Sequence, residues 1–329
     1  MPETKKNAIA IDFRQLLKQE RAKARSNKKK SQLTSIKPIS ETNIINHDEN
    51  KNIEHSLSQS SQSEMYLRQL LKWTQKHMLN HTIPIASPLP NRSSCINSIY
   101  YIPNFLPFEF SELLLHWLQS IPTLSSTSSS QNTYSSHIGK WTPLHHAKRK
   151  VLLYDATISP IPPPLQYIID LLLFHNVFSS DDPQTIPNHI LINEYQPGQG
   201  ILYHTDGPTY QPKTVTISIG NSHVLFRFHP RYPQNNQPTT EKLFVSGRGS
   251  CLMFEHEAYT EYLHGIEEVL QESICSNSCL NWEDYCQECQ TYNNNEYDYD
   301  VYREKYDKAS DMVQRGYRIS LTFRHKIKE

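Results

Sequence analysis

A histidine and a carboxylate stand two residues apart in the run NEYQPGQGILYHTD, at His204 and Asp206. On an extended strand both side chains leave the same face. Such a pair supplies two ligands of a 2-His-1-carboxylate triad, which holds non-haem Fe(II) and leaves positions open for a cosubstrate and oxygen. Because H-x-D is common by chance, an exposed turn remains the alternative until a third ligand is found.

The third ligand is expected at a distal histidine after a later strand. GSCLMFE, from Gly249 to Glu255, is a short apolar run typical of a strand, and His256 and His264 follow it. His264 is the better candidate, because it lies between an apolar residue and Gly265, where a tight turn could present one ring nitrogen. His256 lies among acidic and small residues, which favours a solvated side chain.

A strand with one polar and one apolar face is predicted in RGYRISLTFRH, close to the end of the sequence. The polar positions are Arg318, Ser320, Thr322 and Arg324, and they alternate with Ile319, Leu321 and Phe323. Arginine suits bidentate binding of a carboxylate. The alternative is an ordinary half-exposed strand with basic residues on its wet side.

The order H-x-D, distal histidine, R-x-S-x-T-x-R resembles the AlkB family of Fe(II)/2-oxoglutarate dioxygenases, and within it most closely the AlkB homologue 6 type. The motif N-x-Y-x-x-G-x5-H-x-D is matched by Asn193, Tyr195, Gly198, His204 and Asp206. The stretches HTDGPTYQPKTVTISIG and YLHGI match as well. The resemblance covers residues 95 to 270 and 314 to 327.

The resemblance implies a role for each matching residue. His204, Asp206 and His264 would hold iron, and Asn193 and Tyr195 would hydrogen-bond 2-oxoglutarate. Arg318 would pair with the distal carboxylate of 2-oxoglutarate, and Arg324 would lie near its metal-bound end. The chain departs from the family at Ser320, where many relatives carry asparagine, and in the long stretch between His264 and Arg318.

The activity implied is oxidative demethylation of alkylated nucleic acid, with Fe(II), 2-oxoglutarate and molecular oxygen. Two alternatives stay open: the same chemistry on a protein side chain, or a binding module that has lost turnover. The complete ligand and arginine sets argue against lost turnover.

Composition sets the frame around this site. The 329 residues suffice for one large domain with tails, and equal numbers of acidic and basic residues, 33 each, favour no partner by bulk charge. No apolar run approaches the length of a membrane span and no secretory signal is visible. We therefore expect a soluble intracellular chain, and we further predict a monomer that occurs in the nucleus and cytoplasm. Eight of the nine glycines lie from Gly198 to Gly316, which marks that region as the structured core.

The fold expected is α+β, with a double-stranded β-helix (jelly-roll) core and flanking helices in residues 95–329. Helices are predicted over 107–121 and 162–178. Strands are predicted around 189–195, 201–204, 214–220, 224–228, 242–245, 250–254 and 318–324. Residues 1–63 are predicted to be a disordered tail whose basic run, Lys18–Lys30, is either a nuclear or nucleic-acid tether or a solvated segment. Residues 64–94 are predicted to be an amphipathic helix and a linker.

Two further segments carry candidate residues. Trp141, Lys148, Arg149 and Lys150 fall in the family's substrate lid and could contact phosphate or base, although a charge run before a strand is also typical of a solvated edge. An insert at about 272–314 carries Cys275, Cys279, Cys286 and Cys289. Four cysteines could bind one zinc, but the scarcity of apolar residues favours a disordered acidic insertion.

Overall fold

The computed structural model of the chain describes residues 49–77, 96, 98–124, 134–144, 147–232, 240–293 and 310–327. Several predictions from the sequence lie outside these residues: most of the tail (1–48), the linker after residue 77, and the side chain of Cys289. Residues 49–63 were expected to be disordered. They are helical instead and belong to the first described helix, α2 (Glu49–His77).

The larger of two facing sheets has seven antiparallel strands. In spatial order they are β1 (Ile99–Ile102), β9 (Arg248–Glu255), β6 (Lys213–Gly220), β13 (Arg318–Arg324), β4 (His189–Tyr195), β3 (Arg149–Asp155) and β2 (Thr142–Leu144). The strand predicted near the end of the sequence, β13, lies between β6 and β4 in the middle of this sheet. Both of its edges are therefore hydrogen-bonded, and every residue of the strand except Thr322 is buried.

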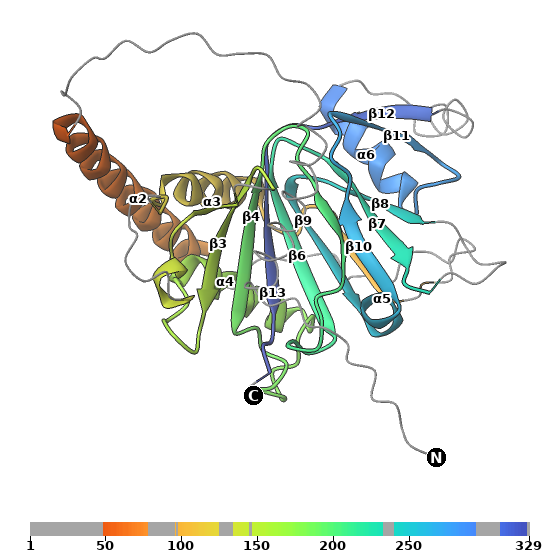
Figure 1. The fold of residues 1–329 in the computed structure, drawn as a ribbon, viewed down its shortest axis with the longest axis horizontal. Helices are drawn as coiled ribbons and strands as arrows, with labels where there is room; N and C mark the ends of the chain where they lie inside the picture. Colours follow the sequence, from red (N-terminus) through yellow and green to blue (C-terminus); the bar gives the residue numbers. More distant parts are fainter. Residues whose placement is uncertain are drawn as a thin grey trace, which may run out of the picture.

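Helices cover one face of this sheet (Figure 1). α3 (Phe108–Ser120) and α4 (Pro163–Phe174) pack against it, and α2 packs on both helices through Leu70 and Trp73. The apolar positions of β13 face this layer: Ile319, Leu321 and Phe323 belong to the same buried cluster as Phe110 and Ile168. The alternation predicted from the sequence therefore holds: the apolar face of β13 packs against the helices, and its polar face points to the opposite side of the sheet.

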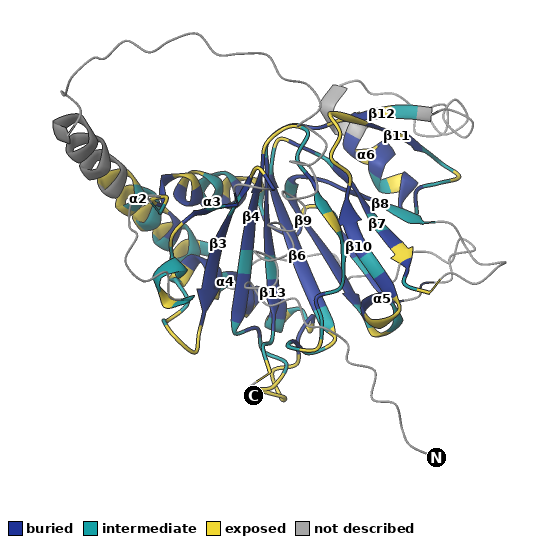
Figure 2. Ribbon diagram, in the orientation of Figure 1, coloured by how far each residue is buried: buried dark blue, intermediate teal, exposed yellow. Residues whose placement is uncertain are grey.

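The smaller sheet has four antiparallel strands and faces the opposite side of the large sheet. In spatial order they are β5 (Ile201–His204), β10 (Tyr262–Ile266), β7 (Val224–Pro230) and β8 (Glu241–Val245). A second apolar cluster joins the two sheets, with Phe226 and Phe228 of β7 against Leu252 and Phe254 of β9. This is the expected jelly-roll core, and Figure 2 shows its strands to be largely buried. A short helix, α5 (His256–Thr260), leads from β9 into β10.

The prediction of a disordered insert is wrong for its described residues. β11 (Gln271–Cys275) pairs with β12 (Ser310–Gln314), and α6 (Trp282–Asn293) lies beside them. Trp282, Tyr285 and Ile274 form a buried cluster with Leu225 and Phe244, on the outer side of the small sheet. A few large side chains at helical spacing suffice to hold the insert, although the segment as a whole is polar.

No helix among the described residues is both long enough and apolar enough to cross a membrane.

Candidate metal centre and cosubstrate site

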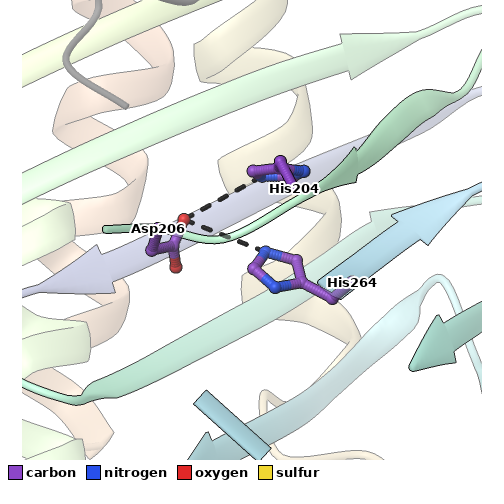
Figure 3. A group of neighbouring side chains, drawn as sticks. All are labelled: His204, Asp206 and His264. Carbon is purple, nitrogen blue, oxygen red and sulfur yellow. Dashed lines mark ion pairs between the residues drawn. The ribbon is translucent and has the colours of Figure 1, made fainter. Parts of the chain in front are cut away.

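Two histidines and one aspartate meet between the sheets (Figure 3). His204 ends β5, and His264 lies directly opposite on β10. Asp206 Oδ1 lies 3.9 Å from His204 Nε2 and 3.8 Å from His264 Nε2. One potential ligand atom from each residue lies within 4.8 Å of the other two, and no other described group of three His, Cys, Asp or Glu residues does so. The set is a 2-His-1-carboxylate triad, the donor set that suits Fe(II).

Two details of the expected geometry differ in the structure. Asp206 lies beyond the end of β5, so the turn after the strand, rather than a shared strand face, brings it beside His204. His264 lies within β10 rather than at a tight turn. His256, the rejected candidate, is exposed and 3.7 Å from Glu255, as its acidic surroundings indicated.

The two histidines are held neutral, with a nitrogen available for a metal. Burial, aided by the neighbouring His204, lowers the pKa of His264 to about 3. Burial also lowers the pKa of His204. The Nδ1 atom of His204 lies 2.8 Å from the carbonyl oxygen of Leu202. A carbonyl oxygen only accepts, so Nδ1 carries the proton and Nε2 keeps its lone pair for a metal.

The third ligand, Asp206, is held as a carboxylate by neighbours from other strands. Arg324 Nη1 donates to Oδ1 at 2.7 Å, and Thr214 Oγ1 donates to Oδ2 at 2.6 Å. Burial works to raise the pKa of Asp206, but Arg324 and the two histidines outweigh it and hold that pKa well below its usual range. Arg324 therefore pairs directly with Asp206, the predicted carboxylate ligand of the metal. Thr214 was not predicted, because nothing in the local sequence marks it.

A directional chain of hydrogen bonds lies behind Arg324. Tyr134 donates its only hydroxyl proton to Asp155 Oδ2 at 3.1 Å, so the 3.2 Å contact from His189 Nε2 to the Tyr134 oxygen makes Nε2 the donor. Burial, with the cations Arg324 and Lys326 nearby, lowers the pKa of His189 to about 3, so its Nδ1 is a bare acceptor. Tyr210 donates to it at 3.4 Å and places its ring 4.0 Å from the guanidinium of Arg324. The chain fixes the position of that guanidinium.

The residues expected to bind the cosubstrate line the same cavity. Asn193 and Tyr195 on β4 lie opposite Ser320 and Arg318 on β13, so the four face one another across a single strand pair. All four are buried. The alternative of a half-exposed strand with a wet basic side is wrong for β13, since its polar side chains line the cavity that holds the metal triad.

Arg318 is prepared for an anion. Its Nε and Nη2 atoms donate to Ser218 Oγ at 3.2 and 2.8 Å, and its guanidinium lies 5.4 Å from the centre of the Tyr195 ring. Nη1 is buried and has no hydrogen-bond acceptor among the described residues. Burial lowers the pKa of Arg318 to about 10, so it stays charged. A buried guanidinium with a vacant donor fits a carboxylate of 2-oxoglutarate.

Comparison with known proteins bears on this geometry. The family model of the 2OG-Fe(II) oxygenase superfamily matches residues 98–324, which include the triad and both arginines. The chain belongs to the 2OG-Fe(II) oxygenase superfamily. This oxygenase is 28% identical over 243 residues to "Probable RNA/DNA demethylase ALKBH6" of Danio rerio, covering 69% of the chain and 85% of that protein.

More distant relatives are also found. An uncharacterised protein, L905, of Acanthamoeba polyphaga mimivirus is 25% identical over 183 residues, covering 55% of this chain and 68% of that protein. Among solved structures, a 2OG-Fe(II) oxygenase family oxidoreductase of Burkholderia pseudomallei aligns with a TM-score of 0.37 at 13% identity, covering 70% of this chain and 84% of that one. A prolyl-4-hydroxylase of Pseudomonas putida aligns with a TM-score of 0.36 at 9% identity, covering 70% and 93%.

The resemblance to the AlkB family is confirmed by the superfamily match and by the similarity to ALKBH6. The chain is a dioxygenase that uses Fe(II), 2-oxoglutarate and molecular oxygen. Bound iron supplies the oxidising chemistry, with 2-oxoglutarate as the reductant that is converted to succinate. His204, Asp206 and His264 would hold the iron, and the buried polar side chains of β4 and β13 would orient the cosubstrate.

The lid predicted for this oxygenase needs correction at two of its four residues. Trp141 is buried, and its indole donates to the carbonyl oxygen of Leu118 at 2.8 Å, so it packs the core. Arg149 is buried as well and donates to Asn193 Oδ1 at 3.3 Å. Lys148 is exposed, and Lys150 lies 3.0 Å from Glu194. A role for these two lysines in substrate binding stays a prediction.

The structure does not bring the described cysteines of the insert together as a zinc site. Cys279 and Cys286 are buried in the apolar cluster beside Trp282, while Cys275 lies 3.0 Å from Ser278 Oγ. Within the described side chains these cysteines form no group with metal-binding geometry. The observed role of Cys279 and Cys286 is packing, which is common for buried cysteine.

Proposed function

We propose that this dioxygenase is an AlkB-type oxidative demethylase of alkylated nucleic acid. The observation that carries the proposal is the similarity to ALKBH6, which extends over most of the chain, taken with a complete triad and cosubstrate set in one cavity. Hydroxylation of an N-methyl group followed by loss of formaldehyde is the reaction that this chemistry delivers on such a substrate.

Different residues would bind the iron and the 2-oxoglutarate. His204, Asp206 and His264 would hold the iron on one side of the cavity, and Arg318 would bind the distal carboxylate of 2-oxoglutarate on the other. Phe226 lies parallel to the His264 ring, with the ring centres 5.7 Å apart. Phe254 also contacts that ring, with the centres 4.8 Å apart. These apolar walls orient the ligand and exclude water from one side of the site.

The exposed Lys148 supports a nucleic-acid substrate. Its backbone carbonyl accepts a hydrogen bond from the side chain of Gln199, in the loop that leads into β5 and His204. A cation at this place is suited to a phosphate. The basic run Lys18–Lys30 supports a second proposal, that the protein occurs in both nucleus and cytoplasm.

The test is succinate and formaldehyde release by the protein loaded anaerobically with Fe(II), then given 2-oxoglutarate and oxygen. Methylated and unmethylated single-stranded DNA and RNA of the same sequence are compared. Formaldehyde released only with a methylated oligonucleotide supports the proposal. Succinate release that no oligonucleotide stimulates would support the oxygenase activity, but it would contradict a nucleic-acid substrate and favour a protein substrate. The variant Lys148→Ala should weaken oligonucleotide binding and its salt dependence, with succinate release in the absence of substrate unchanged.

A further inference from the structure

The loop at residues 196–200 joins the two halves of the site. It leaves β4 just after Asn193 and Tyr195 and enters β5, which ends at His204. Its backbone is pressed against the small sheet, since a Cβ atom on Gly200 would come within 2.3 Å of the Ile266 carbonyl oxygen. This loop is therefore the direct connection between the cosubstrate residues on β4 and a metal ligand on β5.

Two buried arginines hold this loop by its carbonyl oxygens. Arg149 Nη1 donates to the carbonyl of Gly200 at 3.3 Å, while its Nε donates to Asn193 Oδ1 at 3.3 Å. From another part of the chain, Arg315 Nη2 donates to the carbonyl of Gln199 at 2.9 Å. Arg149 comes from the start of β3, and Arg315 directly follows β12, the last strand of the insert.

Arg315 is itself locked at the root of the insert. Its Nη1 atom donates to Glu272 Oε1 at 2.6 Å, and the opposite carboxylate oxygen, Oε2, lies 2.5 Å from Arg227 Nη1. Only 3% of the Arg315 side chain and 2% of the Glu272 side chain are exposed. Removing one partner of such a buried ion pair is strongly destabilising, because it leaves the other charge uncompensated. The first and last strands of the insert thus meet at one ion pair, and that ion pair reaches the loop.

We infer that Arg315 is a positioning residue for 2-oxoglutarate binding, through which β11 and β12, the paired strands of the insert, hold the 196–200 loop. A guanidinium has the forked donors to bridge Glu272 and the carbonyl of Gln199 at once, which a lysine ammonium on the same stem does not reproduce. The insert is then part of the site's framework. This inference rests on the dioxygenase and not on its substrate class.

The test compares two identical changes at arginines that both anchor the insert. Arg315→Lys keeps the charge beside Glu272 and loses the bridge to the loop. The matched control is Arg248→Lys, because Arg248 Nε lies 3.2 Å from Glu288 Oε1 on α6 and anchors the insert away from the loop. In the full chain, 2-oxoglutarate binding is measured by anaerobic titration of the Fe(II) protein, and amide hydrogen exchange is measured over residues 196–204.

We expect Arg315→Lys to weaken 2-oxoglutarate binding about tenfold, the effect typical of residues that orient the direct binding residues of a site. We also expect faster amide hydrogen exchange over residues 196–204. Arg248→Lys should leave both at the values of the unmodified chain. Unchanged binding and exchange in Arg315→Lys, or equal effects in the two variants, would overturn the inference. If Arg315→Lys does not fold, Glu272→Gln is read in the same two assays, since Glu272 on β11 accepts the hydrogen bond from Arg315 Nη1 and links the insert to that arginine. No change in that variant would overturn the inference as well.

Discussion

At the scale of single residues, the site depends on polar atoms whose partners come from distant strands. Asp206 is oriented by Thr214 on β6 and Arg324 on β13, and Arg318 is oriented by Ser218 on β6. These partners hold both oxygens of Asp206, each of which keeps a lone pair for a metal, and they leave Arg318 Nη1 available for the cosubstrate. Single substitutions should therefore separate metal binding from cosubstrate binding.

Replacing His204 by alanine should abolish succinate formation and leave the fold intact. His204 ends an edge strand and its ring lies against that of His264, with the ring centres 4.3 Å apart, so its removal should disturb little of the packing elsewhere. The free energy of unfolding of the metal-free protein should change by about 1 kcal/mol or less. Iron content, succinate release and thermal melting are measured together. Loss of folding would instead indicate that this histidine is a structural residue.

Arg318→Lys should raise the 2-oxoglutarate requirement. A lysine cannot hold both Ser218 and a carboxylate, and losing a charged hydrogen bond costs about 1.5–3 kcal/mol, or roughly ten- to a hundredfold in affinity. The KM for 2-oxoglutarate is the measurement. Arg324→Lys is the matched control, because Arg324 pairs with Asp206 and its loss should weaken iron binding first. A KM unchanged in Arg318→Lys would contradict the place given to that arginine.

At the scale of elements, the insert is the feature that changes most between sequence and structure. Although its composition is polar, three side chains of α6 are buried, Trp282, Tyr285 and Cys286, and their spacing puts them on one face of the helix. That face meets Leu225 and Phe244 of the small sheet. The described part of the insert is thus packed against the small sheet.

Trp282→Ala should destabilise the protein by about 3–5 kcal/mol, the usual cost of removing a large buried aromatic side chain. Chemical denaturation of the full chain measures this directly. Gln287→Ala, an exposed position on the same helix, is the control and should have a small effect. Equal, small effects in both variants would restore the view that the insert is disordered.

At the scale of the whole molecule, several histidines are buried in the neutral form. Burial lowers the pKa of His189 and His264 to about 3 and that of His223 to about 4, from an ordinary value of 6.5. Between these values the unfolded chain binds protons that the folded chain does not. The stability that these groups supply is therefore present above pH 6.5 and is lost as the pH falls towards 3.

The metal-free protein should accordingly lose stability on acidification, by about 2 kcal/mol per buried histidine at pH 5. Thermal melting between pH 7.5 and pH 5 measures the loss. His223→Gln should make the profile less steep by the share of one histidine, because glutamine does not titrate. A melting temperature independent of pH over this range would contradict the buried neutral state.

The sequence alone was enough to predict the chemistry and much of the local structure. The H-x-D motif, His264 and the alternation of β13 are short-range patterns, and the strands at 189–195, 201–204 and 318–324 have the predicted bounds. Periodicity determines the two faces of β13 because side chains alternate along any strand. The order of the motifs then indicated the family.

Only the tertiary structure decided which residues meet. Trp141 and Arg149 carry the types expected of a substrate lid, but they are buried against Leu118 and Asn193. The pairing of β13 with β6 brings Arg324 beside Thr214, and both residues bind Asp206, although Arg324 and Asp206 lie 118 residues apart along the chain. Local sequence determines the face on which a side chain lies, whereas pairing between distant strands determines what that face touches, and such pairing leaves no mark in a short stretch of residues.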